Sequence, residues 1–519
     1  MKKALLIFSL LFNVCLFSKA QFKQIAAGPE FNEPYSVSSQ FLLLKNGNLV
    51  FTDIGFRDSI LIRVYNTAHK EIAVTSYLMS SPAKRTYLGL KAVFEINGDA
   101  VLFIIAEEDK ANVLYRVIVD PNSGLVKKEE KIFGLKPQTR NESYAVWRGN
   151  LGVSKVADSD DYAIMYCNNF RSEKIKKIEI VLFNKDNVET GRSFYETAEK
   201  EFEYLDFNGM TVINSEKVAL LFAGYTWTNN LRDQDQKLSL AIMKKGSSTL
   251  SIIKLNLPED KVPNNPKIYY NSQSKRLIVV AVCGGKKVDQ YLCFFDPETG
   301  KAEKIITVNF SDAINEKIKE VNGKKYDFFG KPANLLVEKS GGFSVVFEED
   351  GYESMGPQAR FTHYYTYDII VANFDKNGKL LNSYLIPKKF VFNPPGSLNY
   401  GGGFGNEYLK LAYIKRADKG YLFINDTREN IERLETNKDP NLVSVVKDCD
   451  AFYFPLTGND PIPARKYLFG KTDEKEDHIQ SAFGVFAYDK ENDVFITMRL
   501  NRDEKKRTKT VNVVWLKPE

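Results

Sequence analysis

The feature that most constrains the fold of this chain is a pattern that recurs along its whole length. A turn rich in Asn, Asp, Gly, Ser and Lys precedes a run of consecutive apolar residues, at intervals of about 50 to 80 residues. The eight apolar runs begin at Leu49, Val101, Tyr162, Val218, Leu277, Phe343, Tyr421 and Val494. A repeat of this length indicates one supersecondary unit, copied and stacked, because a single unit cannot bury both of its faces.

A second hairpin signal follows the apolar run in the first six copies. Its clearest form is Phe-Asp-Pro-Glu-Thr-Gly-Lys, from Phe295 to Lys301. Asp bonds its own backbone at such a turn and Gly supplies a positive φ. Each copy is therefore predicted to hold four antiparallel strands, A to D, with tight A–B and C–D turns. The B strands are apolar on both faces, as expected for strands packed between neighbouring sheets.

These observations predict an all-β fold, a single β-propeller domain over residues 21–519 with four-stranded antiparallel blades. Eight blades are expected, with seven as the alternative because the seventh copy is irregular around Phe454-Pro455. The last copy lacks a D strand before Glu519, whereas residues 22–27 form a spare apolar segment ahead of the first A strand. We predict that this segment, within residues 21–30, completes the last blade, which removes two open sheet edges.

The turn from Phe295 to Lys301 resembles the hairpins of quinoprotein-like and kelch-like propellers among bacterial secreted repeat proteins. The resemblance covers only a few residues per unit, so it implies a fold and no activity. Tryptophan docking of the quinoprotein kind is not expected, since the chain has only three Trp, at positions 147, 227 and 515.

The first twenty residues have the pattern of a signal peptide. Lys2 and Lys3 precede an apolar stretch, and Ser18-Lys19-Ala20 fits a small-x-small cleavage site before Gln21. Asn13 and Val14 make a poor lipobox before Cys15, so plain cleavage is favoured. No later stretch reaches the roughly 18 apolar residues of a membrane span. The prediction is an exported protein, periplasmic or extracellular, that is not integral to a membrane.

Charge and cysteine content exclude some function classes. Cleavage removes three lysines and no acidic residue, so the formal net charge falls from +6 to +3, which predicts no nucleic-acid partner. Cys283 and Cys293 fall on successive strands, and both a disulfide and two buried thiols are open alternatives. No C-x-x-C pair supports a zinc site, and no cofactor is expected.

The long loops are predicted to gather on one face of the ring, the face that carries the B–C and D–A connections. These loops span residues 225–237, 311–332, 348–365, 389–407 and 426–441, whereas every A–B turn is short. The best helix candidate, over residues 312–321, lies among them. Aromatic and Arg side chains, which are enriched at interface cores, identify the candidate binding residues. They are Tyr225, Trp227, Phe328, Phe329, Tyr352, Arg360, His363, Tyr364, Tyr400 and Phe404. The alternative is that these side chains cap the blades.

No chemical motif indicates a reaction. Glu348, Glu349, Asp350 and Glu353 cluster in one loop, where they are either a solvated acidic segment or a Ca²⁺ site. The glycine-rich segment 401–405 is followed by no helix, so it is not a phosphate cradle. No catalytic residue and no metal ligand is predicted.

The leading hypothesis is a non-catalytic binding or scaffolding propeller of the bacterial cell envelope. Its partner would be an envelope protein or a glycan, engaged through the B–C/D–A face. In its Ala-Gln cleavage site and its β chain rich in Lys, Asn and aromatic residues, the sequence resembles accessory or plug-like subunits of outer-membrane secretion complexes, and that resemblance gives the more specific form of the hypothesis. The alternative is a carbohydrate-active hydrolase or lyase, which requires carboxylates from three or more blades to meet at the central pocket.

Overall fold

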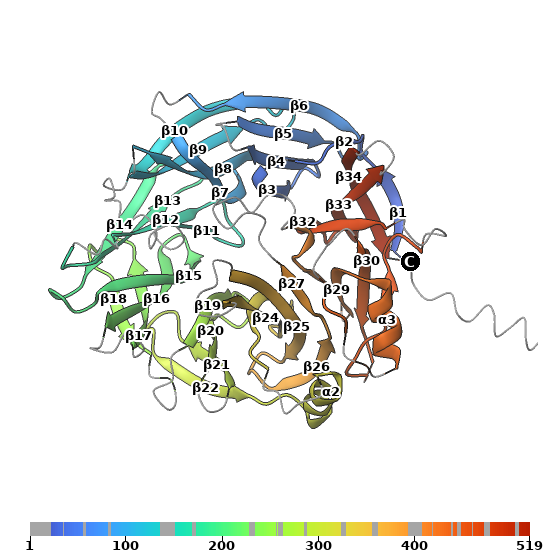
Figure 1. The fold of residues 1–519 in the computed structure, drawn as a ribbon. Coiled ribbons are helices and arrows are strands. Elements are labelled where there is room, and N and C mark those ends of the chain that lie inside the picture. Colours follow the sequence, from blue (N-terminus) through green and yellow to red (C-terminus); the bar gives the residue numbers. More distant parts are fainter. Residues whose placement is uncertain are drawn as a thin grey trace, which may run out of the picture.

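The computed structural model shows eight antiparallel sheets around a central axis, which together form an eight-bladed β-propeller (Figure 1). It describes residues 22–518 apart from 35, 56–58, 81–84, 110, 135–150, 169–172, 228–233, 256, 258–262, 285–287, 323–327, 355–361, 393–406, 418, 437, 439, 444–447, 459, 472–477 and 504–507. The predicted all-β propeller of eight blades is therefore confirmed, and the seven-blade alternative is wrong.

The first four blades follow the chain in order, each with its A strand nearest the axis. Blade 1 holds β3 (Ser36–Leu43), β4 (Leu49–Gly55), β5 (Ser59–Tyr65) and β6 (Glu71–Leu78). Blade 2 holds β7 (Arg85–Ile96), β8 (Asp99–Glu108), β9 (Ala111–Val119) and β10 (Val126–Gly134). Blade 3 holds β11 (Leu151–Lys155), β12 (Tyr162–Asn168), β13 (Lys177–Phe183) and β14 (Glu189–Glu196). Blade 4 holds β15 (Tyr204–Asn214), β16 (Lys217–Trp227), β17 (Gln234–Lys244) and β18 (Ser251–Lys254).

The second half of the ring carries the additions to the repeat. Blade 5 holds β19 (Pro263–Asn271), β20 (Arg276–Cys283), β21 (Asp289–Phe295) and β22 (Ala302–Val308). Blade 6 holds β23 (Lys331–Val337), β24 (Phe343–Ser354), β25 (Thr362–Phe374) and β26 (Leu380–Ile386), with β27 (Phe390–Phe392) added to β25. Blade 7 holds β28 (Ala412–Arg416), β29 (Lys419–Asp426), β30 (Asp450–Leu456) and β31 (Lys466–Tyr467). Blade 8 holds β32 (Gln480–Asp489), β33 (Val494–Asp503), β34 (Thr508–Pro518) and β1 (Phe22–Ala27), with β2 (Phe31–Asn32) also on β34.

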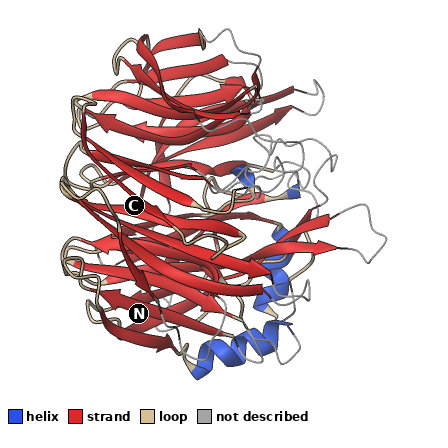
Figure 2. Cartoon of the chain, turned by 90° about the vertical axis from the view of Figure 1, so that its left-hand side faces the viewer, coloured by secondary structure: helices blue, strands red, loops and turns tan. Residues whose placement is uncertain are grey.

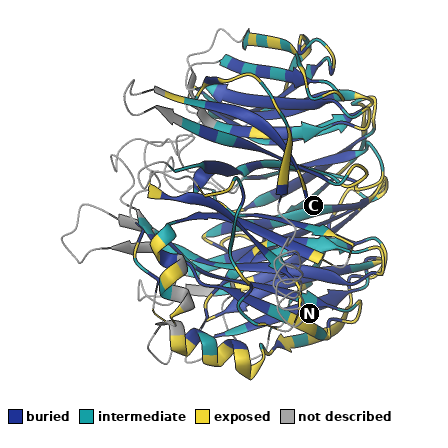
Figure 3. Cartoon of the chain, turned by 90° about the vertical axis from the view of Figure 1, so that its right-hand side faces the viewer, coloured by how far each residue is buried: buried dark blue, intermediate teal, exposed yellow. Residues whose placement is uncertain are grey.

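The apolar B strands are explained by the way in which the blades stack. Successive side chains of a strand point to opposite faces. In β8, Leu102 and Ile104 pack into the core between blades 1 and 2. Val101 and Phe103 pack into the core between blades 2 and 3. All four are 0% exposed, so consecutive residues must be apolar. In side view, buried residues make up most of the strands, and exposed residues gather at the turns and helices (Figure 3).

The ring is closed by the N-terminal strand, as the sequence predicts. β1 pairs antiparallel with β34, from Phe22 opposite Pro518 to Ala27 opposite Val514. The N–H of Gly28 then donates to the carbonyl of Val513 at 2.8 Å, which continues the ladder toward β2. The two ends of the chain therefore share one sheet, and the last blade has its fourth strand.

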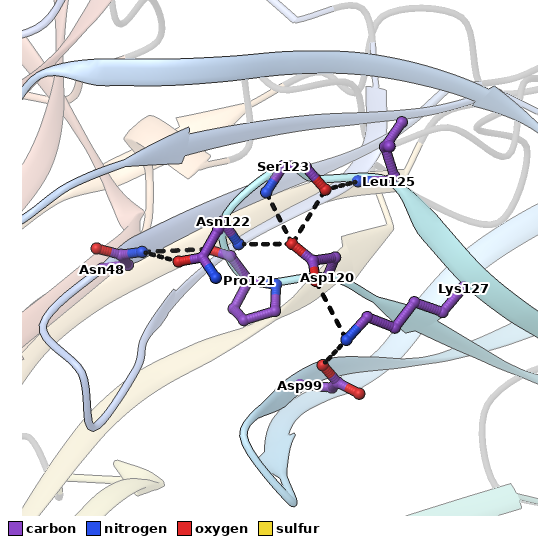
Figure 4. Close-up of polar contacts among 8 residues, drawn as sticks. All are labelled: Asn48, Asp99, Asp120, Pro121, Asn122, Ser123, Leu125 and Lys127. Carbon is purple, nitrogen blue, oxygen red and sulfur yellow. Dashed lines mark hydrogen bonds and ion pairs between the residues drawn. The ribbon is translucent and has the colours of Figure 1, made fainter.

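The tight turns tie each blade to its neighbour, and the turn at Asp120 shows how (Figure 4). The Asp120 carboxylate accepts the backbone N–H groups of Asn122 and Ser123 at 3.0 and 2.9 Å. Asn48 of blade 1 donates to Asn122 at 3.1 Å. Lys127 forms an ion pair with Asp120 at 3.1 Å. The backbone N–H of Ser123 and the neighbouring donors hold the pKa of Asp120 down at about 2, below its usual 3.8.

Because the pKa of Asp120 is lower in the folded chain, its carboxylate is expected to stabilise the fold only while it is ionised. That contribution is full above about pH 4 and disappears as the pH falls through about 2. We expect wild type to be more stable than Asp120→Asn near neutral pH, with the difference shrinking between about pH 4 and pH 2. Urea unfolding of both proteins across this range measures it. If the stability difference between wild type and Asp120→Asn stays constant with pH, the negative charge of Asp120 does not contribute to it.

The two faces of the disc differ, and the helices lie on one side of it (Figure 2). α2 (Asp312–Asn322) occupies the D–A connection between blades 5 and 6, which confirms the helix predicted over 312–321. α3 (Arg428–Glu435) occupies the B–C connection of blade 7. The sequence predicts a long loop over residues 426–441, which is wrong for the residues of α3. Among the described helices, none is long and apolar enough to cross a membrane.

The four described cysteines are buried and form no disulfide. Cys293 lies opposite Val279, and Cys283 lies opposite Asp289. The register therefore does not place the two cysteines across from each other, and of the two alternatives the disulfide is wrong. Burial raises the pKa of the Cys167 and Cys293 thiols to about 12, which keeps them protonated and unreactive.

Candidate functional site

The structure describes part of the predicted binding face. Tyr225 lies near the end of β16 and is half-buried, and Trp227 is the last residue of that strand. Phe328 is only 6% exposed, with its ring 6.0 Å from that of Phe310, so it belongs to the core beneath the face. The neighbouring Phe329 is 44% exposed. Of these four, Phe328 fits the capping alternative best.

Three further predicted residues lie on the long β24–β25 hairpin. Tyr352 pairs with Tyr364, and Glu353 pairs with His363, so the ladder continues outward to Ser354. β27 adds to the same extension, with Phe392 opposite Tyr364. The hairpin thus brings Tyr352, His363 and Tyr364 together through their backbones. Arg360, Tyr400 and Phe404 lie outside the described residues.

The acidic cluster at the start of this hairpin is held by lysines. Glu348 forms an ion pair with the buried Lys388 at 2.9 Å. Asp350 forms one with Lys331 at 3.1 Å. Within the described ranges, no group of three or more His, Cys, Asp or Glu side chains could hold a metal ion. The Ca²⁺ alternative therefore has no support from these residues.

The strands that surround the axis contain a series of irregularities that were not predicted from the sequence. In the described chain, six of the eight A strands shift register within the strand, and a bulge of this kind bends a strand and redirects a side chain. The shifts fall at Ser36/Ser38, Leu90/Ala92, Phe207/Gly209, Asn264/Lys267, Pro332/Asn334 and Ser481/Phe486. Polar residues next to these shifts, including Lys91 and Lys267, lie at the inner edge of the ring.

The most polar stretch of this inner edge lies on blades 4 and 5. Asp206 of β15 and Lys267 of β19 are half-buried on adjacent inner strands. Burial raises the pKa of Asp206, and the nearby Lys267 ammonium opposes that rise. Burial likewise lowers the pKa of Lys267, and Asp206 opposes that change. Among the contacts of the described residues, no hydrogen bond or ion pair joins the two side chains.

Two tyrosine rings lie beside Asp206. Tyr204 and Tyr225 are directly opposite each other on β15 and β16, and their rings stack 4.4 Å apart at 7°. Burial is the main cause of the raised pKa of both phenols, and the Asp206 carboxylate adds to it. Gln236 of β17 donates to the Tyr225 hydroxyl at 2.8 Å. Its own Oε1 is buried and, in the described part of the chain, has no hydrogen-bond partner.

We call Tyr204, Asp206, Tyr225, Gln236 and Lys267 the blade 4–5 cluster. One sequence signal pointed to it: the dipeptide Asn208-Gly209 interrupts an otherwise apolar strand, which is typical of a bulge. Gly209 has φ +152°, and a Cβ there would lie 3.3 Å from Ile268 on the next blade. Tyr225 alone of the five was a predicted site residue. Gln236 also falls in the predicted loop 225–237 but is neither aromatic nor Arg, and the other three lie outside the predicted long loops.

The described inner strands do not gather carboxylates from several blades. Their acidic residues are Glu95, Asp206 and Asp489. Glu95 pairs with Ala100 and Asp489 with Val494, which places both beside A–B turns at the opposite end of the channel from Asp206. The arrangement that a propeller hydrolase needs is therefore not present in these strands.

A separate cavity of 130 Å³ lies at the outer rim, between blades 4 and 5. Its lining is almost entirely apolar and includes Leu255, Cys293 and Ile305. It contains no group suited to acid–base chemistry, and the short β18 accounts for the space.

Comparison with known proteins assigns the chain to no family. No family model and no curated protein matches it. Among solved structures, a mutant of the Synechocystis apocarotenoid oxygenase is similar over 68% of this chain and 74% of its own, with TM-score 0.31 and 10% identity. A structure from a study of two prolyl endopeptidases is similar over 75% of this chain and 54% of its own, with TM-score 0.32 and 9% identity. Likeness at this level carries no inference about activity.

Proposed function

We propose that this chain is a non-catalytic binding propeller of the bacterial cell envelope, exported by its N-terminal signal peptide. Its partner is an envelope protein or a glycan, held on the B–C/D–A face. The observation that supports the proposal is the difference between the connections on the two faces of the disc. One face carries tight turns, apart from the longer connection between β30 and β31 in blade 7, and the other carries α2, α3, the extended β24–β25 hairpin and β27.

The tight-turn face is occupied by contacts between blades. Asp160 of blade 3 accepts the backbone N–H of Asn97 of blade 2 at 2.9 Å and pairs with Lys45 of blade 1 at 3.0 Å. Lys415 of blade 7 pairs with Glu338 of blade 6. These side chains hold the ring together, which leaves the opposite face as the one available to a partner. A plug-like or accessory role in an outer-membrane secretion complex is the finer form of this proposal.

A pull-down of the tagged chain from an envelope extract of its own cells tests the proposal. We expect one stoichiometric partner or glycan fraction with wild type, and its loss when Trp227 and Tyr364 are both changed to alanine. Lys185→Ala is the matched control, because this exposed residue lies in a C–D turn on the other face. Recovery of nothing stoichiometric, or equal recovery with both variants, would contradict binding through the B–C/D–A face.

A further inference from the structure

We propose that the blade 4–5 cluster binds a neutral carbohydrate, with a sugar ring stacked on the tyrosine pair and its hydroxyls bonded to the polar side chains. This inference rests on the proposed binding function and names the class of its ligand. It concerns strand residues at the inner edge of the ring rather than the long loops.

The tyrosine pair supplies a rigid apolar surface. Tyr204 and Tyr225 cover one face of each other, at 4.4 Å and 7°, and the Gln236 amide fixes the Tyr225 hydroxyl. Both side chains are half-buried, so part of the ring surface meets solvent. A tyrosine combines an apolar ring with a polar tip, which suits a ligand that has C–H faces and hydroxyl edges.

The polar side chains of the cluster suit a ligand that both donates and accepts hydrogen bonds. The Asp206 carboxylate accepts from the backbone N–H of Phe207 and attracts the Lys267 ammonium, but among the described residues no hydrogen bond or ion pair joins the two side chains. The Gln236 Oε1 is a buried acceptor, and none of the described residues donates to it. Such an atom in a native structure requires a water, an ion or a ligand to satisfy it. A pair of neighbouring hydroxyls meets all three demands, because each hydroxyl can donate and accept at once.

Charge balance favours a neutral ligand over an anion or a cation. The cluster contains one carboxylate and one ammonium, and burial penalises the charged form of each. A ligand of either sign would add an unbalanced charge to a half-buried site, which costs free energy. A protein segment could stack a proline or an aromatic ring there, but its apolar side chain would offer no hydrogen bond to Asp206, Lys267 or Gln236.

Calorimetric titration of the full chain with maltohexaose, chitohexaose, xylohexaose and mannohexaose tests the inference. We expect at least one of these neutral saccharides to bind saturably. Asp206→Asn, which keeps the size of the side chain, should weaken that binding by about tenfold or more through loss of a charged hydrogen bond. Tyr204→Ala should abolish it. Leu381→Ala is the control, since that side chain is 62% exposed on the outer strand β26, away from the cluster. Circular dichroism shows which variants remain folded.

The outcomes separate this inference from the proposed function. If none of the four saccharides binds wild type, or if Asp206→Asn and Tyr204→Ala bind as wild type does, the cluster is not a carbohydrate site. The pull-down then shows whether the proposed binding function still holds. A partner that is still recovered leaves the binding function standing without this inference. A protein partner that Tyr204→Ala loses while no saccharide binds would assign the cluster to a protein and overturn the proposal.

Discussion

Replacing Phe22 with alanine is expected to lower the free energy of unfolding by about 3 to 5 kcal/mol, the usual cost of deleting a buried aromatic ring. Phe22 is 5% exposed. Its ring centroid lies 5.3, 5.2 and 5.0 Å from those of Tyr421, Phe423 and Tyr453 in blade 7, and 6.4 Å from that of Phe495 in blade 8. This one side chain therefore packs the closing strand against two blades, and equilibrium unfolding in urea measures its contribution.

Ile25→Ala is the matched control, because Ile25 lies on the same strand and is 42% exposed. We expect it to change stability by about 0.5 kcal/mol or less, as surface substitutions usually do. Deletion of residues 21–30 should go further than Phe22→Ala, since it exposes the edge of β34 and opens the ring. A truncated protein that melts at the same temperature as the full chain would show that this segment does not close the ring.

Replacing Arg465 with methionine is expected to destabilise the fold by about 3 to 5 kcal/mol, because it leaves a buried carboxylate without its partner. Arg465 Nη1 lies 2.5 Å from Asp426 Oδ2, and their side chains are 4% and 0% exposed. The guanidinium also lies over the rings of Phe452 and Phe454, at 5.5 and 5.2 Å. Thermal and urea unfolding of the variant measure the loss.

Arg416→Met provides the comparison, since Arg416 pairs with Asp493 but is 44% exposed. A pair of this kind contributes about 0 to 1 kcal/mol. Changing Asp426 to leucine in the Arg465→Met background should recover part of the loss, because the unpaired charge is then gone. Equal stability of the two single variants would show that burial of the Asp426–Arg465 pair has no energetic consequence.

The Asp426–Arg465 pair explains why α3 was not predicted from the sequence. The segment Arg428–Glu435 has eight residues, too few for an isolated helix to be stable in water. Asp426 Oδ1 accepts the backbone N–H of Thr427 at 2.7 Å and the Asn430 side chain at 2.8 Å, which organises the start of the helix. Because Arg465 holds Asp426 in place from 39 residues away, local sequence could not show that the helix forms.

Tertiary contacts also decide which of the predicted binding residues are available to a partner. Tyr225 was found because an aromatic residue at the start of a long loop is a local signal. Phe328 has the same signal, yet its side chain lies in the core, with its carbonyl accepting from Gln290 at 2.8 Å. Whether a loop aromatic faces the solvent or the core depends on the neighbouring blade, and nothing in the adjacent sequence reports that.

The sequence by itself determined the architecture of this protein: eight four-stranded units, and a ring closed by Phe22–Ala27. It could do so because turn residues and runs of apolar B-strand residues are local features. Counting the strands of the last unit then shows that it needs one more strand, which Phe22–Ala27 supplies. Only the tertiary structure decided what lies at the inner edge of the ring. Asp206 and Lys267 come together where two bulged inner strands of blades 4 and 5 pack side by side. The dipeptide Asn208-Gly209 indicates one of these bulges, but no local feature of the sequence shows which residue of the neighbouring blade lies beside it.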